Sequence, residues 1–170
     1  MHVTLILWSI FAAWRWGDWK HWKKYHATML FMALSSAMYD VLVNDGSYYL
    51  WRYVGNNYFS EEMASLLYTC VAFPATALLF LSNFPDERWQ QLLHIGKYVA
   101  IYVCLEIIGL YFGTISHAHS WNMWWSTVFN LAMFSILRLH FTRPLIAYVV
   151  SLAIATYLMI HFQVSLWDSE

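Results

Sequence analysis

The sequence predicts an all-α protein, a polytopic integral membrane bundle of six transmembrane helices with the N- and C-termini both outside. Three observations predict this class. Hydrophobic residues make up 61% of the chain and charged residues 11%, whereas about a quarter of the residues in soluble domains are charged. Six apolar runs divide the chain, and most approach the ~20 residues that a helix needs to cross the hydrocarbon core. Basic residues fall in alternate gaps between these runs.

The predicted helices follow the apolar runs, at about 2–16, 27–43, 63–83, 98–114, 121–137 and 144–163. Together they make residues 1–170 a single transmembrane domain. The first run is the shortest, and its length leaves open whether it spans the membrane fully. Basic residues follow this run, whereas in a signal peptide they precede it. We therefore expect the first run to remain in the protein as a helix.

Eight of the nine Lys and Arg residues lie in the gaps after the first, third and fifth runs: Arg15, Lys20, Lys23, Lys24, Arg88, Lys97, Arg138 and Arg143. Short loops rich in Lys and Arg stay on the cytoplasmic side, so the alternation predicts the orientation of every helix. Topology and contact with anionic lipid account for these charges. No basic surface remains that would indicate a nucleic-acid partner.

Aromatic residues mark the expected membrane interfaces. The predicted anchors are Arg15, Trp16, Asp18, Trp19, Trp121, Trp124 and Trp125. Tryptophan prefers the level of the lipid headgroups, and aromatic cages for cations are rare by comparison. Residues 15–25 alternate Trp with basic residues, which is typical of an amphipathic segment lying in the interface.

Two features interrupt the regular pattern. Residues 44–62 form the longest predicted loop, either a lid over the outer mouth or an ordinary surface loop. Pro74 lies midway along the third run, where its missing N–H predicts a bend. Pro144 opens the sixth run, where a proline is tolerated in the first turn.

Glu106 is the residue that fits lipid least. An acid near the bilayer midplane costs roughly 3 kcal/mol by insertion scales, so it implies a partner or a task. Glu106 and Asn130 are equally far in sequence from Ala118, the expected centre of the turn between the fourth and fifth helices. Antiparallel helices of equal rise place such residues at the same depth. The sequence therefore predicts a hydrogen bond between Glu106 and Asn130.

Several polar residues fall in the expected outer halves of the helices, where small or polar residues recur at helical spacing. Those we single out as candidate ligand-binding residues are Asp40, Thr69, Glu106, Asn122, Ser126 and Asn130. They predict an outward-facing polar cavity; the alternative is a set of isolated contacts between helices, each worth about 0.6 kcal/mol. For Asp40 and Glu106, a role in ligand binding and a role in holding helices together have equal support. Whether these two acids share one site stays open. No catalytic residue is assigned.

Metal and cofactor sites are not predicted. His117 and His119 are two residues apart, which turns their side chains away from each other on a helix. A continuous helix would also place Glu106 ~16 Å from His117. We find no motif for a nucleotide, a flavin or a catalytic metal, so we expect no metal and no cofactor.

Three stretches together suggest a family. Trp16-Gly17-Asp18-Trp19, Phe73-Pro74-Ala75-Thr76 and Trp121-Asn122-Met123-Trp124-Trp125-Ser126 resemble motifs of an uncharacterised family of small multi-pass membrane proteins from spore-forming Gram-positive bacteria. Ser120 departs from the Gly expected before the Trp-Asn pair. The resemblance implies a bacterial plasma membrane and no known activity. It makes Asp18, Glu106, Asn122 and Asn130 the positions to test.

Three functions agree with the sequence. The first is the binding or transport of a small solute, a cation or a lipid headgroup in the cavity around Glu106. The second is a structural or regulatory subunit that docks another membrane protein. The third is an intramembrane enzyme in which Glu106, oriented by Asn130, acts as an acid on a lipid or terpenoid substrate. We rank them in this order, with the lipid bilayer as the partner common to all three.

Overall fold

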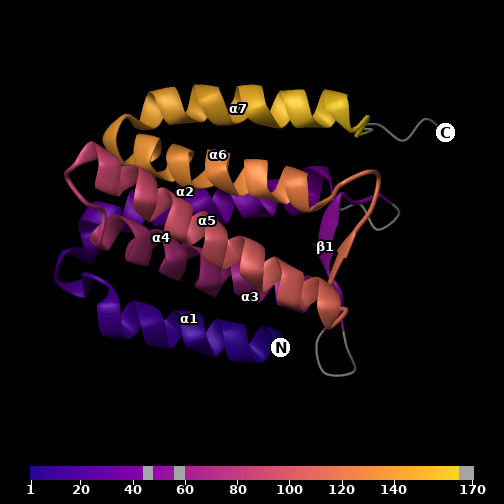
Figure 1. The fold of residues 1–170 in the computed structure, drawn as a ribbon, viewed down its shortest axis with the longest axis horizontal. Coiled ribbons are helices and arrows are strands. Elements are labelled where there is room, and N and C mark those ends of the chain that lie inside the picture. The colour runs from indigo at the N-terminus through magenta and orange to yellow at the C-terminus, as the bar shows by residue number, and fades with distance from the viewer. Residues whose placement is uncertain (44–47, 56–59, 165–170) are drawn as a thin grey trace.

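The computed structural model describes residues 1–43, 48–55 and 60–164 and is mostly helical (Figure 1). Six helical rods follow one another in the described part of the chain. Five are single α-helices: α1 His2–Trp16, α2 Trp22–Leu42, α5 Arg88–Tyr111, α6 Met123–Thr142 and α7 Pro144–His161. The other rod is continuous but composite, with α3 Glu61–Leu67, the π-helical turn η2 Tyr68–Ala72 and α4 Phe73–Ser82. A short 3-10 turn, η1 Trp19–His21, precedes α2.

The rods match the predicted helices in number and order, but several ends differ. α5 begins at Arg88, ten residues before the predicted start, and α2 begins at Trp22. The apolar runs mark only the hydrophobic part of each helix, whereas backbone hydrogen bonding continues through the polar residues beside it. The structure also contains two short strands, β1 Trp51–Tyr53 and β2 Ile115–His117, that the apolar pattern does not predict.

Three rods are long and apolar enough to cross a membrane: Glu61–Ser82, Arg88–Tyr111 and Pro144–His161. α7 lies at the edge of the bundle against α6 (Figure 1). Its large apolar side chains, among them Leu145 and Val149, are mostly exposed. A helix that is apolar on all sides and exposed at the edge of a bundle is suited to lipid, which supports association with a membrane.

The two ends of the bundle differ in composition. The connections after α1, α4 and α6 meet at one end, which we call the basic end. Arg15, Lys20, Lys23, Lys24, Arg88, Arg138 and Arg143 lie at or near it, and Lys97 lies in the first half of α5. Both described termini lie at the opposite end, beside β1 and β2 (Figure 1). We call this the sheet end.

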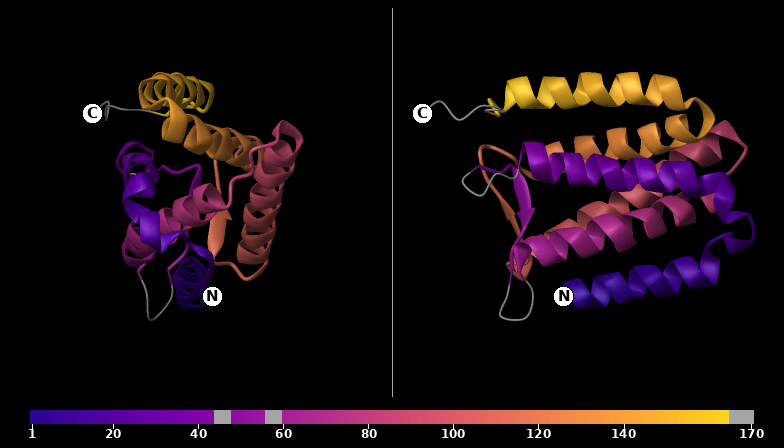
Figure 2. Two further views of the ribbon diagram at one scale, coloured as in Figure 1. Left: turned by 90° about the vertical axis from the view of Figure 1, so that its left-hand side faces the viewer. Right: turned by 180° about the vertical axis from the view of Figure 1, so that it is seen from behind.

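An apolar core fills the centre of the bundle. α4 packs against α1 and α2, and α6 packs against α5, α7 and α2 (Figure 2). Leu78 and Phe80 of α4 are fully buried against Phe134 and Leu137 of α6. The core therefore lies between the basic end and the sheet end and separates them.

Pro74 lies at the start of α4, directly after η2. The backbone N–H of Phe73 donates to the carbonyl of Tyr68, five residues back, which is the π-helical pattern. Pro74 has no N–H to continue the ordinary pattern. The irregularity predicted at Pro74 thus occurs as a π-turn just before it, and Tyr68 and Thr69 within that turn are buried.

Candidate functional site

The candidate site lies at the sheet end and depends on a reversal of the chain after α5. Gly113 has a φ of 65°, a conformation that glycine adopts without steric cost. The Thr114 N–H donates to the carbonyl of Gly109. The following residues then return across the end of the bundle as β2, which pairs with β1 in antiparallel register, Trp51 opposite His117 and Tyr53 opposite Ile115.

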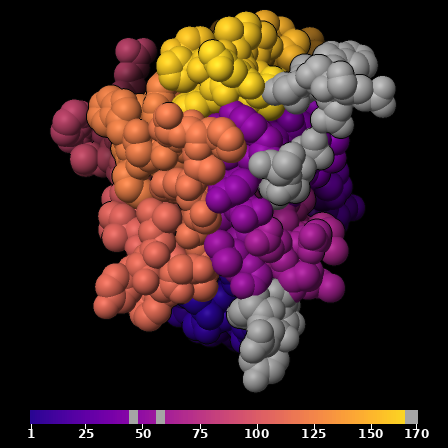
Figure 3. Space-filling model, turned by 90° about the vertical axis from the view of Figure 1, so that its right-hand side faces the viewer, coloured from indigo at the N-terminus to yellow at the C-terminus, as the bar shows by residue number. Residues whose placement is uncertain are grey.

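Strand β1 is fixed to α2 by a tyrosine. The Tyr39 hydroxyl donates to the carbonyl of Trp51 at 2.5 Å and accepts from the Trp51 N–H at 2.9 Å. Residues 48–55 and 114–121 lie side by side across the sheet end in the space-filling view (Figure 3). The part of the predicted 44–62 loop that the structure describes therefore lies across this end of the bundle; residues 44–47 and 56–59 lie outside the described residues.

Glu106 is buried beneath this sheet, within the last two turns of α5, with 7% of its surface exposed. Its Oε1 accepts a hydrogen bond from Ser126 Oγ at 2.6 Å and lies 2.7 Å from His117 Nε2. The Trp121 indole N–H donates to Ser126 Oγ at 2.8 Å. One carboxylate thus joins α5, α6 and β2 through a chain of hydrogen bonds.

The predicted hydrogen bond between Glu106 and Asn130 is wrong, because no such bond joins these two described residues and His117 and Ser126 bind the carboxylate instead. Asn130 is buried on α6. The predicted separation of ~16 Å between Glu106 and His117 is also wrong. Both predictions assumed that the helix continues to the turn, whereas α5 ends at Tyr111 and β2 folds back over Glu106.

Gly109 explains how β2 approaches so closely. A Cβ atom at this position would lie 2.5 Å from the Ile115 side chain and 3.3 Å from that of Met1. The absence of a side chain at Gly109 therefore lets strand β2 and the residue before α1 approach the helix closely.

The second acid, Asp40, lies near the end of α2 and faces α3. Ser65 Oγ donates a hydrogen bond to Asp40 Oδ2. One turn away, the hydroxyls of Ser36 and Thr69 are hydrogen-bonded at 2.8 Å. The predicted site residues Asp40 and Thr69 therefore belong to one polar seam between α2 and the composite rod.

Tyr53 of β1 is buried at the same end of the bundle as the two acids. Its ring stacks on Tyr68 with centroids 4.2 Å apart and meets His2 edge-on at 5.5 Å. Burial raises the pKa of the Tyr53 hydroxyl well above its ordinary value, and the charges of Tyr68, Tyr102, Asp40 and Glu106 add to the rise. Tyr53 therefore packs between the start of α1 and the π-turn η2 at the sheet end.

We call this group the outer polar cluster; its members are Asp40, Tyr53, Ser65, Glu106, His117 and Ser126. In the described part of the chain no Lys or Arg forms an ion pair with either of its two carboxylates; Arg52 pairs with Glu61 instead, at 3.4 Å. The described residues also contain no group of three His, Cys, Asp or Glu side chains that could hold a metal ion.

The other residues predicted for the site or as interface anchors lie outside the outer polar cluster. Asn122 is exposed and caps α6, accepting hydrogen bonds from the Trp124 and Trp125 N–H groups. Trp124 is 71% exposed. At the basic end, the Arg15 guanidinium lies 6.0 Å from the Trp16 ring, and the Trp19 indole donates to the Ala13 carbonyl at 2.7 Å.

Sequence reasoning missed two histidines at the sheet end. His2 is 2% exposed, its Nε2 donates to the Val54 carbonyl at 3.2 Å, and its Nδ1 lies 3.4 Å from the Tyr68 hydroxyl. His117 was considered only as part of a metal pair with His119 and was not assigned to the site. The signal that could have found His117 is Gly113, because a glycine directly after an apolar run often ends a helix and permits a reversal.

Comparisons with protein-family models, curated proteins and solved structures give no match to this chain. The resemblance in the Trp-rich stretches therefore stays a prediction, and the geometry of the outer polar cluster carries the functional argument.

Proposed function

We propose that all six rods cross a bacterial plasma membrane, with the basic end in the cytoplasm and the sheet end outside. The gathering of basic residues at one end supports this orientation. The bacterial membrane rests on the family resemblance alone. A reporter that is active only outside the cytoplasm, fused after Glu170, should be active; an inactive, intact fusion would contradict the orientation.

We further propose that the protein binds a small cation in the outer polar cluster. One observation carries this proposal: two carboxylates, Asp40 and Glu106, lie at the sheet end without a Lys or Arg partner in the described chain. Acids in membranes are rare and costly, and they mark ligand or ion pathways. The groups around them are hydroxyls and one imidazole, which leaves negative charge for a cationic ligand to balance.

The chemistry of the cluster suits a hard monovalent cation or a small ammonium group. Hard cations bind oxygen ligands, carboxylates above all. Glu106 is buried beneath β2, so a ligand reaches it only when the sheet moves away from the end of α5. His117 and Ser126 hold the carboxylate in the closed state, and a bound cation would replace the hydrogen bond from His117.

Binding tests this function directly. The detergent-purified protein is titrated with Na⁺, K⁺ and tetramethylammonium, and its melting temperature is followed at constant ionic strength. We expect one of these cations to raise the melting temperature, because a ligand that binds only the folded state stabilises it. Asp40→Asn and Glu106→Gln should each abolish the rise.

The matched control is Glu62→Gln, which removes an exposed acid at the same end of the bundle. A rise that persists in both cluster variants, or that is lost equally in Glu62→Gln, would contradict binding at the cluster. No response to any of the three cations would overturn the assignment of these cations as ligands.

The other two functions have less support. The hypothesis of acid catalysis required Asn130 to orient Glu106 through a hydrogen bond. The two residues are not hydrogen-bonded, so this hypothesis loses its main support. A subunit role requires a protein partner, which crosslinking in the native membrane would reveal. Crosslinking to one defined partner, together with no ligand response, would favour that second function.

A further inference from the structure

Each acid of the outer polar cluster has one carboxylate oxygen bound by a serine hydroxyl. Ser126 Oγ donates to Glu106 Oε1 at 2.6 Å, and Ser65 Oγ donates to Asp40 Oδ2. Among the described residues, no hydrogen bond reaches the second oxygen of either acid, Glu106 Oε2 or Asp40 Oδ1. The open positions of the cluster are therefore carboxylate oxygens, which accept hydrogen bonds and donate none.

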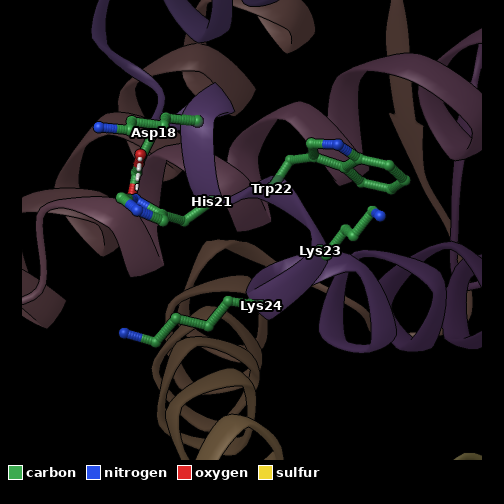
Figure 4. Close-up of a pocket in the computed structure, with 6 residues that line it drawn as sticks. Asp18, His21, Trp22, Lys23 and Lys24 are labelled. Carbon is green, nitrogen blue, oxygen red and sulfur yellow. Dashed lines mark hydrogen bonds and ion pairs between the residues drawn. The ribbon is translucent and has the colours of Figure 1, made fainter.

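Asp18 at the basic end differs in this respect. Both of its carboxylate oxygens face His21 Nδ1, at 3.0 and 3.1 Å, and Oδ2 also accepts from the Tyr25 hydroxyl at 3.2 Å. The close-up shows this pairing of Asp18 with His21 (Figure 4). Asp18 thus has a partner at each oxygen, whereas each acid of the outer polar cluster keeps one oxygen open within the described chain.

Trp121 fixes the direction of the hydrogen bond to Glu106. Its indole N–H donates to Ser126 Oγ at 2.8 Å, and an indole has no acceptor. The single hydroxyl proton of Ser126 must therefore point away from Trp121, toward Glu106 Oε1. Because Ser126 is buried, no solvent competes for this proton, and the hydroxyl has none left to donate to a ligand.

This arrangement favours an ammonium group over a bare metal ion. Hard cations take a shell of roughly six oxygen ligands, whereas the described groups that bind Glu106 are one hydroxyl and one imidazole nitrogen. The described residues also contain no group of three His, Cys, Asp or Glu side chains that could hold a metal ion. The cluster therefore offers single directed acceptors instead of a coordination shell.

A protonated amine supplies the donors that such acceptors need. Its N–H groups carry the positive charge, and hydrogen bonds between ionised groups are the strong ones. Glu106 Oε2 accepts one N–H, and the position that His117 leaves at Oε1 accepts a second. A quaternary ammonium group has no N–H and would leave both positions without a donor.

On the basis of the cation site proposed above, we infer that its ligand is a protonated primary amine. The amine displaces His117 from Glu106, while the hydrogen bond from Ser126 remains. Trp121 is then a positioning residue, because it keeps the Ser126 hydroxyl directed at the carboxylate and leaves Oε2 for the ligand.

The test compares methylammonium, tetramethylammonium and K⁺ on the detergent-purified full chain at pH 7 and constant ionic strength. Methylammonium should raise the melting temperature at about tenfold lower concentration than either of the other cations, which have no N–H to donate. Hydrogen bonds to charged groups contribute about tenfold or more in affinity.

A pair of variants tests the role of Trp121. Trp121→Phe keeps an aromatic ring but removes the N–H that positions Ser126, so half of the methylammonium response should require about a fivefold higher concentration. The matched control is Trp125→Phe. Trp125 stacks on Trp121, but its indole N–H has no hydrogen bond to a described residue, so the control should stay within about twofold of the wild type.

The outcomes separate this inference from the proposed function. A response to K⁺ or tetramethylammonium at the same or a lower concentration would overturn the assignment of an amine and leave the cation site standing. No response to any of the three cations would overturn both. Equal changes in Trp121→Phe and Trp125→Phe would overturn the role of Trp121. If Trp121→Phe does not fold, Ser126→Ala removes the directed hydroxyl itself and should show a loss of about the same size.

Discussion

The two ends of the bundle handle charge in opposite ways. At the sheet end Glu106 is buried and hydrogen-bonded to His117 and Ser126. At the basic end Lys20, Lys23 and Lys24 are exposed. Burying a charge is costly unless it is well paired, whereas a lysine at the interface keeps its contact with water and headgroups. The exposed lysines of the basic end therefore carry little energetic cost, whereas the buried acid of the sheet end requires partners that offset its burial.

Substitution in the apolar core that separates the two ends should reduce the stability of the protein more than any other change. Phe134 is fully buried, with ring centroids 5.1 Å from both Phe80 and Tyr102. Phe134→Ala should lower the free energy of unfolding by about 4 kcal/mol, because it leaves a cavity. Reversible unfolding in mixed detergent would measure the loss. Phe129→Ala, on the exposed side of the same helix, is the control and should cost far less; equal losses would contradict this position of the core.

A smaller loss is expected when the acid at the sheet end is removed. Glu106→Leu leaves the His117 and Ser126 donors without their acceptor, and each unsatisfied buried group costs roughly 1–3 kcal/mol. Part of this cost is offset by burial of the leucine, so we expect about 2 kcal/mol in the same unfolding experiment. Glu62→Leu, at an exposed acid of the same end, should be nearly neutral.

An unchanged or higher stability of Glu106→Leu would contradict a structural role for this network. That result would mean that Glu106 lowers the stability of the folded protein. A residue that lowers stability in this way is typical of a functional site.

The reversal that closes the sheet end depends on one glycine. Gly113→Ala should cost about 1 kcal/mol, because an L-residue is strained at a φ of 65°. Gly96→Ala lies on the exposed side of α5 with nothing within 4 Å of the added Cβ, so it should be neutral or slightly stabilising. Thermal melting of both variants gives the comparison, and a cost at position 96 but not at 113 would contradict the described turn.

The smallest effect concerns Asp18 at the basic end. Partial desolvation raises the pKa of this carboxyl, but the hydrogen bonds and charge of His21 and the hydrogen bond from Tyr25 outweigh it and lower the pKa below its ordinary value of 3.8. A lowered pKa stabilises the folded state above that ordinary value, and the contribution is lost as the pH falls through the folded-state pKa.

Asp18→Asn should therefore melt slightly below the wild type at pH 7, and the difference should shrink below pH 4. Melting curves from pH 7 to pH 2.5 test this, with Asp86→Asn as a control at the same end. A difference that stays constant down to pH 2.5 would show that the ionisation of Asp18 contributes nothing to stability.

The sequence by itself determined the helical class, the order of the six rods and the gathering of basic residues at one end. These features depend on local hydrophobicity and on charge counts, which can be read along the chain. Asp40, Thr69, Glu106 and Ser126 were also found in this way, because polar residues within apolar runs stand out.

Only the tertiary structure decided which residues meet Glu106. The sequence predicted Asn130, on the assumption that two helices continue to a simple turn, whereas the left-handed Gly113 returns the chain and brings His117 to the carboxylate. The positions of Tyr53 and His2 likewise depend on strand pairing and on packing between residues far apart in sequence. Such long-range contacts leave no periodic signal in the chain, so no local pattern predicts them.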